Sequence, residues 1–152
     1  MSSLYGCFLP LLPEPADILD AACGSGRDAR AFATLGHEGT AFDASPALVA
    51  LAEHHVGQTV HCLRFQDISW QDAFDGIWAC ASLPYVPAAK LPVVMRRLRR
   101  ALKPGGVLYA SFKSTAAASA STTAGVSAIW GFWPKLPNMF SSPNLTVWAK
   151  NP

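Results

Sequence analysis

The sequence predicts an α/β domain built on a doubly wound, mostly parallel sheet with helices on both faces. Segments with strand character alternate with helical segments along most of the chain. A turn of small residues, AACGSG, follows the first strand-like segment, and glycines there permit a tight passage from strand to helix. At 152 residues the chain has the length of one domain with a single hydrophobic core.

Strands are expected where short apolar or β-branched runs are bounded by turn residues. The five predicted strands cover residues 16–20, 39–43, 60–65, 75–81 and 107–112. Helices are expected where apolar residues recur every three or four positions. The predicted helices cover residues 2–12, 27–35, 46–55 and 88–102. The last helix has the clearest pattern, because its apolar side chains form one stripe opposite four arginines.

Residue types that begin and end helices stand at the predicted boundaries. Pro13 and Pro15 are expected to stop the first helix, and Gly36 lies just past the second. Ser45 is expected to cap the third helix, with Pro46 at its first position and Gly57 beyond its end.

Composition excludes a disordered chain, because 51% of the residues are hydrophobic and only 14% are charged. Residues 1–75 hold all ten acidic residues and three arginines, a net charge of −7. Residues 76–152 hold nine basic residues and no acidic one, a net charge of +9. Opposite charges on two halves of one domain favour a single folded unit, so nucleic acid is not an expected partner. The arginines of the last helix are interpreted as a solvated face, with contact to RNA or phosphates as the alternative: Arg96, Arg97, Arg99 and Arg100.

The cysteine and histidine patterns predict neither a disulfide framework nor a metal site. The four cysteines form no C-x-x-C pair, which favours a reducing, cytoplasmic setting. The adjacent His54 and His55 diverge on a helix, and no acidic residue stands at ligand spacing. The apolar segment 4–12 has no preceding basic residue, so a secretion signal is not expected. No apolar run is long enough for a membrane span.

Acidic residues follow or end three successive predicted strands. Asp20 ends the first strand, Asp43 the second, and Asp67 lies just after the third. In an open α/β sheet ligands bind beyond these strand ends, at the switch point beside the first strand. Gly24 and Gly26 allow backbone N–H groups to approach a ligand at a helix N-terminus. A carboxylate beside a helix N-terminus suits a zwitterion, and a second carboxylate suits ribose hydroxyls.

Over residues 4–113 the chain resembles class I S-adenosylmethionine-dependent methyltransferases, especially the small ones of the tellurite-resistance type. The resemblance rests on the segments ILDAACGSGRD, TAFDASPALVALA, RFQDISW, DGIWACASLPYV and LKPGGVLYASFK. It implies a Rossmann-like fold, S-adenosylmethionine as cofactor, and in-line transfer of a methyl group to a small-molecule acceptor. Because the methyl donor is already activated, a general base is optional, and none is identified.

The resemblance also implies a set of cofactor-binding residues: Asp20, Ala22, Gly24, Gly26, Asp43, Ala44, Asp67, Ile68 and Ala81. It places Asp20 and the glycines at the methionyl end, Asp43 at the ribose, Asp67 and Ile68 at the adenine, and Ala81 under the sulfonium. Ala22 stands where the family has its first glycine.

Two alternatives remain open for the function. Residues 24–29 also fit the G-x-G-x-x-A pattern of a nicotinamide dinucleotide site. The family normally has a further segment before the residues that begin here at Met1, and the chain departs from its pattern after Lys113. A truncated or pseudo-enzyme fragment that binds S-adenosylmethionine without turnover is therefore the second alternative.

Four side chains near the predicted strand ends have less specific interpretations. Ser82 and Tyr85 follow the fourth strand, where an acceptor-side role is considered. Cys23 and Cys80 have no evident base nearby and are interpreted as packing residues.

We expect one domain over residues 1–152, with a cofactor-binding core at 1–113 and an atypical tail at 114–152. In the fold that the chain resembles, a final antiparallel strand covers the fifth strand. Within the tail, residues 145–149 have the clearest strand pattern, so they are predicted to pair antiparallel with 107–112. Two further expectations are a neighbouring strand at 126–132 and an irregular connection at 114–124.

Overall fold

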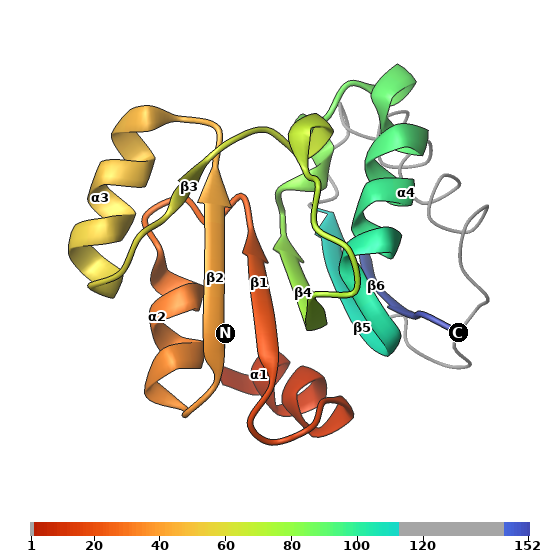
Figure 1. Cartoon of the computed structure of the whole chain (residues 1–152), viewed down its shortest axis with the longest axis horizontal. Coiled ribbons are helices and arrows are strands. Elements are labelled where there is room, and N and C mark those ends of the chain that lie inside the picture. Colours follow the sequence, from red (N-terminus) through yellow and green to blue (C-terminus); the bar gives the residue numbers. More distant parts are fainter. Residues whose placement is uncertain (1, 113–144) are drawn as a thin grey trace.

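The computed structural model describes residues 2–112 and 145–152, which form a six-stranded sheet with helices packed against it (Figure 1). The strand order is β3-β2-β1-β4-β5-β6. The strands are β1 (Asp17–Ala21), β2 (Glu38–Asp43), β3 (His61–Cys62), β4 (Phe74–Cys80), β5 (Leu102–Phe112) and β6 (Leu145–Lys150). All neighbouring strands run parallel except β5 and β6, which are antiparallel. The predicted α/β fold with a doubly wound, mostly parallel sheet is confirmed.

Helices cover both faces of the sheet, as predicted. The α-helices are α1 (Ser2–Phe8), α2 (Arg27–Thr34), α3 (Pro46–Val56) and α4 (Leu91–Ala101). The short 3₁₀ turns are η1 (Leu9–Leu11), η2 (Phe65–Asp67), η3 (Leu83–Tyr85) and η4 (Ala88–Lys90). Apolar side chains of α4 pack on one face, and those of α1 and α2 pack on the other. Within the described ranges, no helix has the length and apolar character to cross a membrane.

The boundaries of α3 confirm the sequence prediction. The Ser45 hydroxyl accepts a hydrogen bond from the backbone N–H of Leu48, and Pro46 occupies the first position of the helix. Gly57 ends the helix in the left-handed conformation, with a φ of 76°. These residues fix where the chain leaves β2 and where it returns toward β3.

Several predicted elements differ from the structure, and the predicted helix 2–12 is divided into α1 and η1. β3 has only two residues instead of the predicted 60–65, because the chain turns inward and Phe65 packs edge-to-face on Phe42 at 5.2 Å. The predicted helix 88–102 is divided into η4 and α4, and Leu102 already belongs to β5. β5 begins at Leu102 because that residue pairs with Phe74, and the pairing shifts register before it resumes at Val107.

The C-terminal strand is the predicted one, extended by one residue to Lys150. Its register runs from Leu145 opposite Phe112 to Lys150 opposite Val107. Asn151 fixes the end of this strand, because its backbone N–H donates to the carbonyl of Gly106 at 2.7 Å. The predictions for 126–132 and 114–124 lie outside the described residues.

Candidate functional site

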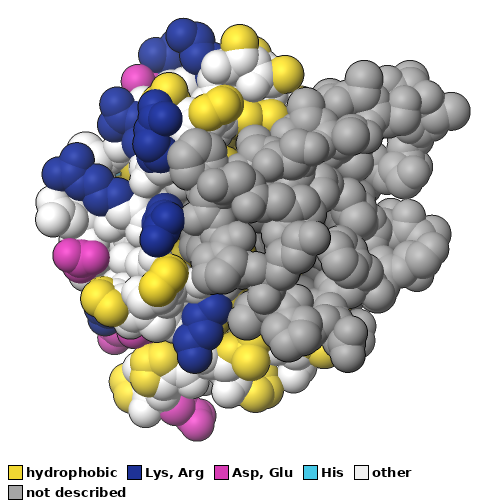
Figure 2. All heavy atoms as spheres, turned by 90° about the vertical axis from the view of Figure 1, so that its right-hand side faces the viewer, with side chains coloured by type: hydrophobic (Ala, Val, Ile, Leu, Met, Phe, Trp, Pro, Cys, Tyr) yellow, Lys and Arg dark blue, Asp and Glu magenta, His cyan; other side chains and the backbone are white. Residues whose placement is uncertain are grey.

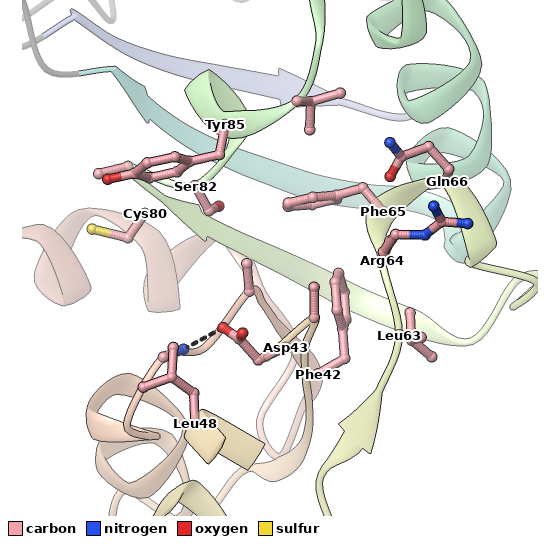
Figure 3. Close-up of a pocket in the computed structure, with 15 residues that line it drawn as sticks. Phe42, Asp43, Leu48, Leu63, Arg64, Phe65, Gln66, Cys80, Ser82 and Tyr85 are labelled. Atoms are coloured by element: carbon pink, nitrogen blue, oxygen red, sulfur yellow. Dashed lines mark hydrogen bonds between the residues drawn. The ribbon is translucent and has the colours of Figure 1, made fainter. Parts of the chain in front are cut away.

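Two adjoining pockets open at the carboxyl edge of the parallel strands. The larger has a volume of about 510 Å³ and is lined by the ends of β2 and β4 and by the segments that follow β3 and β4 (Figure 3). The smaller has a volume of about 260 Å³ and lies at the turn from β1 into α2. Ala22, Gly24 and Cys80 line both pockets, so the two meet at the tips of β1 and β4. This is the switch point of the sheet, because β1 pairs with β2 on one side and with β4 on the other.

The smaller pocket contains a buried carboxylate that forms no ion pair within the described residues, although the charge of Arg27, which also lines the pocket, acts on it. Asp20 is 4% exposed, and its Oδ2 accepts a hydrogen bond from the backbone N–H of Ala29 in α2 at 2.9 Å. Burial, followed by the charge of Asp28, raises the pKa of Asp20 to about 8. No basic side chain among residues 2–112 and 145–152 forms an ion pair with Asp20. A ligand cation in this pocket would therefore stabilise its charged form.

A second carboxylate lines the smaller pocket, and sequence reasoning did not single it out. Asp28 accepts hydrogen bonds from the hydroxyl of Tyr5 at 2.6 Å, from Nε of Arg27 at 2.8 Å and from Nε1 of Trp78 at 2.9 Å. Burial alone would raise the pKa of Asp28, but these three donors hold it below its usual value. Asp28 therefore connects α1, α2 and β4 beneath the pocket. Its place in the first helical turn gave no indication of these long-range partners.

The two glycines of the turn have different roles. Gly24 has a φ of +57°, lines both pockets, and a Cβ there would meet no atom within 4 Å. Gly26 has a φ of +80° and lines neither of these pockets. A Cβ on Gly26 would lie 2.7 Å from Cγ2 of Val56 and 3.3 Å from Cα of Ala52, so this glycine allows α2 to pack closely on α3. Only Gly24 leaves backbone open toward the site.

Asp43 joins the turns that follow β1 and β2. It is 8% exposed, and its Oδ2 accepts a hydrogen bond from the N–H of Gly24 at 2.9 Å (dashed in Figure 3). Its Oδ1 accepts from the N–H of Ser45 at 2.9 Å. Each carboxylate oxygen keeps acceptor capacity for a further donor. Asp43 and its neighbour Ala44 both line the larger pocket.

The structure does not bring Asp67 and Ile68 together with the other predicted site residues. The Asp67 carboxylate forms an ion pair with Arg64 at 2.8 Å, and neither Asp67 nor Ile68 lines the two pockets. Ile68 is buried in the core, 1% exposed. The wall after β3 is formed instead by Leu63, Arg64, Phe65 and Gln66. The strand-end pattern missed this wall because η2 turns the chain.

Basic side chains gather on the side of the molecule that carries α4 (Figure 2). They are not only a solvated face, which corrects the interpretation made from the sequence. Arg97 donates to the carbonyl of Ile68 at 2.6 Å, and Arg100 donates to Oε1 of Gln71 at 2.9 Å. These bonds attach the segment after η2 to α4.

The end of β4 supplies the remaining wall of the larger pocket. Ala81 adopts a left-handed conformation with a φ of 52°, and its N–H donates to Oγ of Ser111 at 2.9 Å. The chain then continues through Ser82, Tyr85 and Val86, which also line the pocket. Ser82 is buried, whereas Tyr85 is 88% exposed. The two side chains considered for an acceptor-side role therefore both border the larger pocket.

The cysteines beside the site are not activated nucleophiles. Burial is the main cause that raises the pKa of Cys23 to about 12, and burial also raises the pKa of Cys80. Both thiols therefore stay protonated near neutral pH. These values agree with the packing role expected from the sequence.

Comparison with protein families shows to which family the chain belongs. A family model described as a methyltransferase domain matches residues 18–106, which include the strands and turns around both pockets. The chain belongs to the class I S-adenosylmethionine-dependent methyltransferases. Nothing in the comparisons supports the dinucleotide-binding alternative.

Relatives of this methyltransferase include a ubiquinone biosynthesis O-methyltransferase from Xanthomonas axonopodis pv. citri. It is 30% identical over 153 residues, which cover 93% of this chain and 63% of that protein. Solved structures that share the fold include the following two. A protein from Pyrococcus horikoshii has a TM-score of 0.80 at 17% identity, with 99% of this chain and 90% of that chain covered. The N-methyltransferase NodS from Bradyrhizobium japonicum, in complex with S-adenosyl-L-homocysteine, has a TM-score of 0.78 at 14% identity, with 99% and 87% covered.

The present chain spans about three fifths of the length of the curated relatives that it matches. The matched family model nevertheless covers Asp20 in β1, Asp43 in β2 and Ala81 just after β4.

Proposed function

We propose that the chain binds S-adenosylmethionine across the two pockets and transfers its methyl group to an oxygen atom of a small acceptor. The observation that carries this proposal is the junction of two unlike pockets at the tips of β1 and β4. One holds a buried carboxylate, Asp20, that forms no ion pair with any described residue, and the other is bordered by a carboxylate with free acceptor capacity. A ligand with an ammonium group at one end and a ribose beyond it matches this arrangement.

The residues that border the pockets fit such a ligand in order. Asp20 would face the ammonium group, because the cation would relieve the cost of ionising a buried carboxylate. Gly24 would lie against the middle of the ligand, where it has no Cβ to obstruct approach. Asp43 would accept from the ribose hydroxyls, and Phe65 and Gln66 would border the adenine. In this arrangement Gln66 takes the place that the sequence assigned to Asp67.

When bound, S-adenosylmethionine supplies a methyl group that a nucleophile displaces in line from the sulfonium, which leaves S-adenosylhomocysteine. The residues of the chain align the reactants and exclude water, and alignment of this kind contributes about 7–11 kcal/mol to lowering a barrier. Within the described part of the chain, no histidine lines either pocket. We therefore assign no general base, and the acceptor proton leaves to solvent.

An oxygen acceptor is favoured by the names of the curated relatives, which are O-methyltransferases. We also propose that residues 1–152 form one domain with a cofactor-binding core at 1–113, because β6 of the tail pairs along β5 of the core. A cytoplasmic location stays a prediction from the cysteine pattern.

Calorimetric titration with S-adenosylmethionine, S-adenosylhomocysteine and NAD tests cofactor binding. We expect both sulfur ligands to bind in preference to NAD. Asp43→Ala should weaken S-adenosylhomocysteine binding about 5- to 150-fold, because it removes a charged acceptor of the ribose hydroxyls. Glu38→Ala is the matched control, since Glu38 is exposed at the opposite end of the same strand. Tight NAD binding without a response to S-adenosylhomocysteine would contradict the proposal.

Turnover is tested by measuring S-adenosylhomocysteine formation with a panel of phenols, carboxylic acids and amines. Methylated products on oxygen are the expected outcome. Methylation of nitrogen acceptors alone would leave the proposed cofactor binding intact but would contradict the proposal of an oxygen acceptor.

A further inference from the structure

A shallow groove lies on the outer surface of α2, where the C-terminal end of α3 approaches that helix. It has a volume of about 440 Å³, and its lining residues are Arg27, Arg30, Ala31, Thr34, Leu35 and His55. It shares only Arg27 with the smaller pocket, and, unlike both pockets of the candidate site, it has no carboxylate among these residues. Leu35, at one end of the groove, is 52% exposed. The groove therefore combines an exposed apolar surface with cationic side chains.

The two arginines of the groove differ in their partners. Nε of Arg27 donates to the carboxylate of Asp28 at 2.8 Å, so this cation is already paired. The exposed guanidinium of Arg30 forms no hydrogen bond or ion pair within the part of the chain that the structure describes. Residues 1–75 carry a net charge of −7, so an unpaired arginine among them stands out against its surroundings. Its charge favours a partner that carries a carboxylate.

The chain presents such a carboxylate beside an exposed leucine on a neighbouring surface. Leu11, at the end of η1, is 45% exposed. Glu14 is exposed and forms no ion pair within the described residues. This segment lies close to the end of α2, because the backbone N–H of Ala16 donates to Nδ1 of His37 at 3.2 Å. In Figure 1, α1 and the end of α2 lie at the same end of the sheet.

The spacing within the two surfaces agrees. Arg30 and Leu35 are five residues apart along α2 and its C-cap, a rise of about 7.5 Å. Leu11 and Glu14 are three residues apart, and a chain of that length spans at most about 11 Å. A leucine on Leu35 therefore leaves the carboxylate that follows it within reach of Arg30. Because the two surfaces adjoin on one chain, a two-fold axis allows each of two copies to give and receive the same contacts.

We propose that this face is the interface of a homodimer, in which Leu11 of each copy packs into the α2 groove of the other and Glu14 pairs with the partner's Arg30. The apolar contacts supply most of the affinity, because exposed ion pairs contribute little. The ion pairs fix the register of the two copies. The interface does not depend on the proposed function, because Leu11, Glu14, Arg30 and Leu35 line neither pocket of the candidate site.

Sedimentation equilibrium at micromolar to submillimolar concentrations tests the dimer. We expect the mass of the wild type to rise with concentration toward twice 16.2 kDa. Arg30→Glu should weaken association at least about tenfold, because it places two carboxylates against each other at both symmetric contacts. Glu14→Arg should weaken it similarly, since it opposes two arginines. Lys90→Glu, an equal charge reversal at an exposed residue outside the groove, should leave association unchanged.

The sharpest measurement mixes the two charge-reversed variants. An equimolar mixture of Arg30→Glu and Glu14→Arg should associate about as tightly as the wild type, because both charge contacts of the mixed dimer join a carboxylate to an arginine. Leu11→Ala, which changes no charge, should also weaken association. All three variants should retain the melting temperature of the isolated wild-type subunit, since their side chains are exposed. A monomeric wild type, a dimer that neither charge reversal weakens, or a mixture that stays monomeric would each overturn the proposal.

Discussion

The two pockets of the site are constructed in different ways. The smaller one consists of a tight backbone turn and two buried carboxylates, Asp20 and Asp28, that approach it from β1 and α2. The outer part of the larger one consists of side chains from short 3₁₀ turns, among them Phe65 and Tyr85. Backbone turns and buried charges fix a ligand in one orientation. Apolar rings on turns fix mainly its shape, so changes there are expected to alter which acceptor binds while the fold is retained.

The two carboxylates of the smaller pocket differ from each other in their hydrogen-bond donors and in their pKa values. Asp28 has three side-chain donors, and its pKa lies below the usual value. Asp20 has one backbone donor, and its pKa is raised to about 8. Asp28 is therefore already satisfied within the protein and stabilises the fold. Asp20 is the one that gains from a ligand cation.

The largest stability effect is expected from Asp28→Ala. It leaves the N–H of Trp78 and the hydroxyl of Tyr5 without their acceptor, and two such losses cost about 2–4 kcal/mol of unfolding free energy. Tyr85→Ala, in the other pocket, should change that free energy by less than about 0.5 kcal/mol because the ring is 88% exposed. Urea unfolding measures both. Equal losses would contradict the distinction between the two pockets.

A smaller effect is expected from the pH dependence of S-adenosylhomocysteine binding. Burial, followed by the charge of Asp28, raises the pKa of Asp20 to about 8, so the free protein carries a proton there below that pH. An ammonium group favours the carboxylate, so affinity should rise by up to about tenfold per pH unit between pH 6 and 8. Titrations in buffers of different ionisation enthalpy should detect proton release. Asp20→Asn should abolish the slope, and a pH-independent wild type would contradict the assignment.

The raised pKa of Asp20 also makes the stability of the free protein depend on pH, in the direction opposite to that of ligand binding. Between about pH 4 and pH 8 the folded chain binds one more proton at Asp20 than the unfolded chain does. The contribution of Asp20 to the free energy of unfolding is therefore fully present below about pH 4. It falls as the pH rises toward 8. Binding and folding should respond to pH in opposite directions, and both responses should disappear in Asp20→Asn.

The contrast between the pockets also explains what the sequence was able to predict. The strand-turn-helix unit, Asp20, Gly24 and Asp43 were found because strand ends and glycine turns are local patterns. The segment after β3 was misplaced because Phe65 turns inward to pack on Phe42, a contact between residues distant in sequence. Asp28 was missed for a similar reason, since its partners come from α1 and β4. Local turn patterns and the pairing of β6 with β5 were predictable, whereas side-chain contacts between distant elements were not.

The smallest effect is expected at two alanines that share one conformation on opposite sides of the site. Ala22 at the tip of β1 has a φ of 59°, and Ala81 at the tip of β4 has a φ of 52°. A side chain in this region is strained, whereas glycine adopts it readily. Ala22→Gly and Ala81→Gly should each raise the free energy of unfolding by about 0.5–1 kcal/mol in urea titrations.

Equal gains at Ala22 and Ala81 would show that backbone strain belongs to both strand tips, so that the two pockets differ in their side chains and not in their turns. The hydrogen bond from the Ala81 N–H to Ser111 is retained in the glycine variant, so it does not offset the gain. A gain at Ala22 alone would show that the β4 tip is relaxed, and would extend the difference between the pockets to the backbone. A loss at either position would show that the entropy which glycine adds to the unfolded chain exceeds the strain relieved at that strand tip.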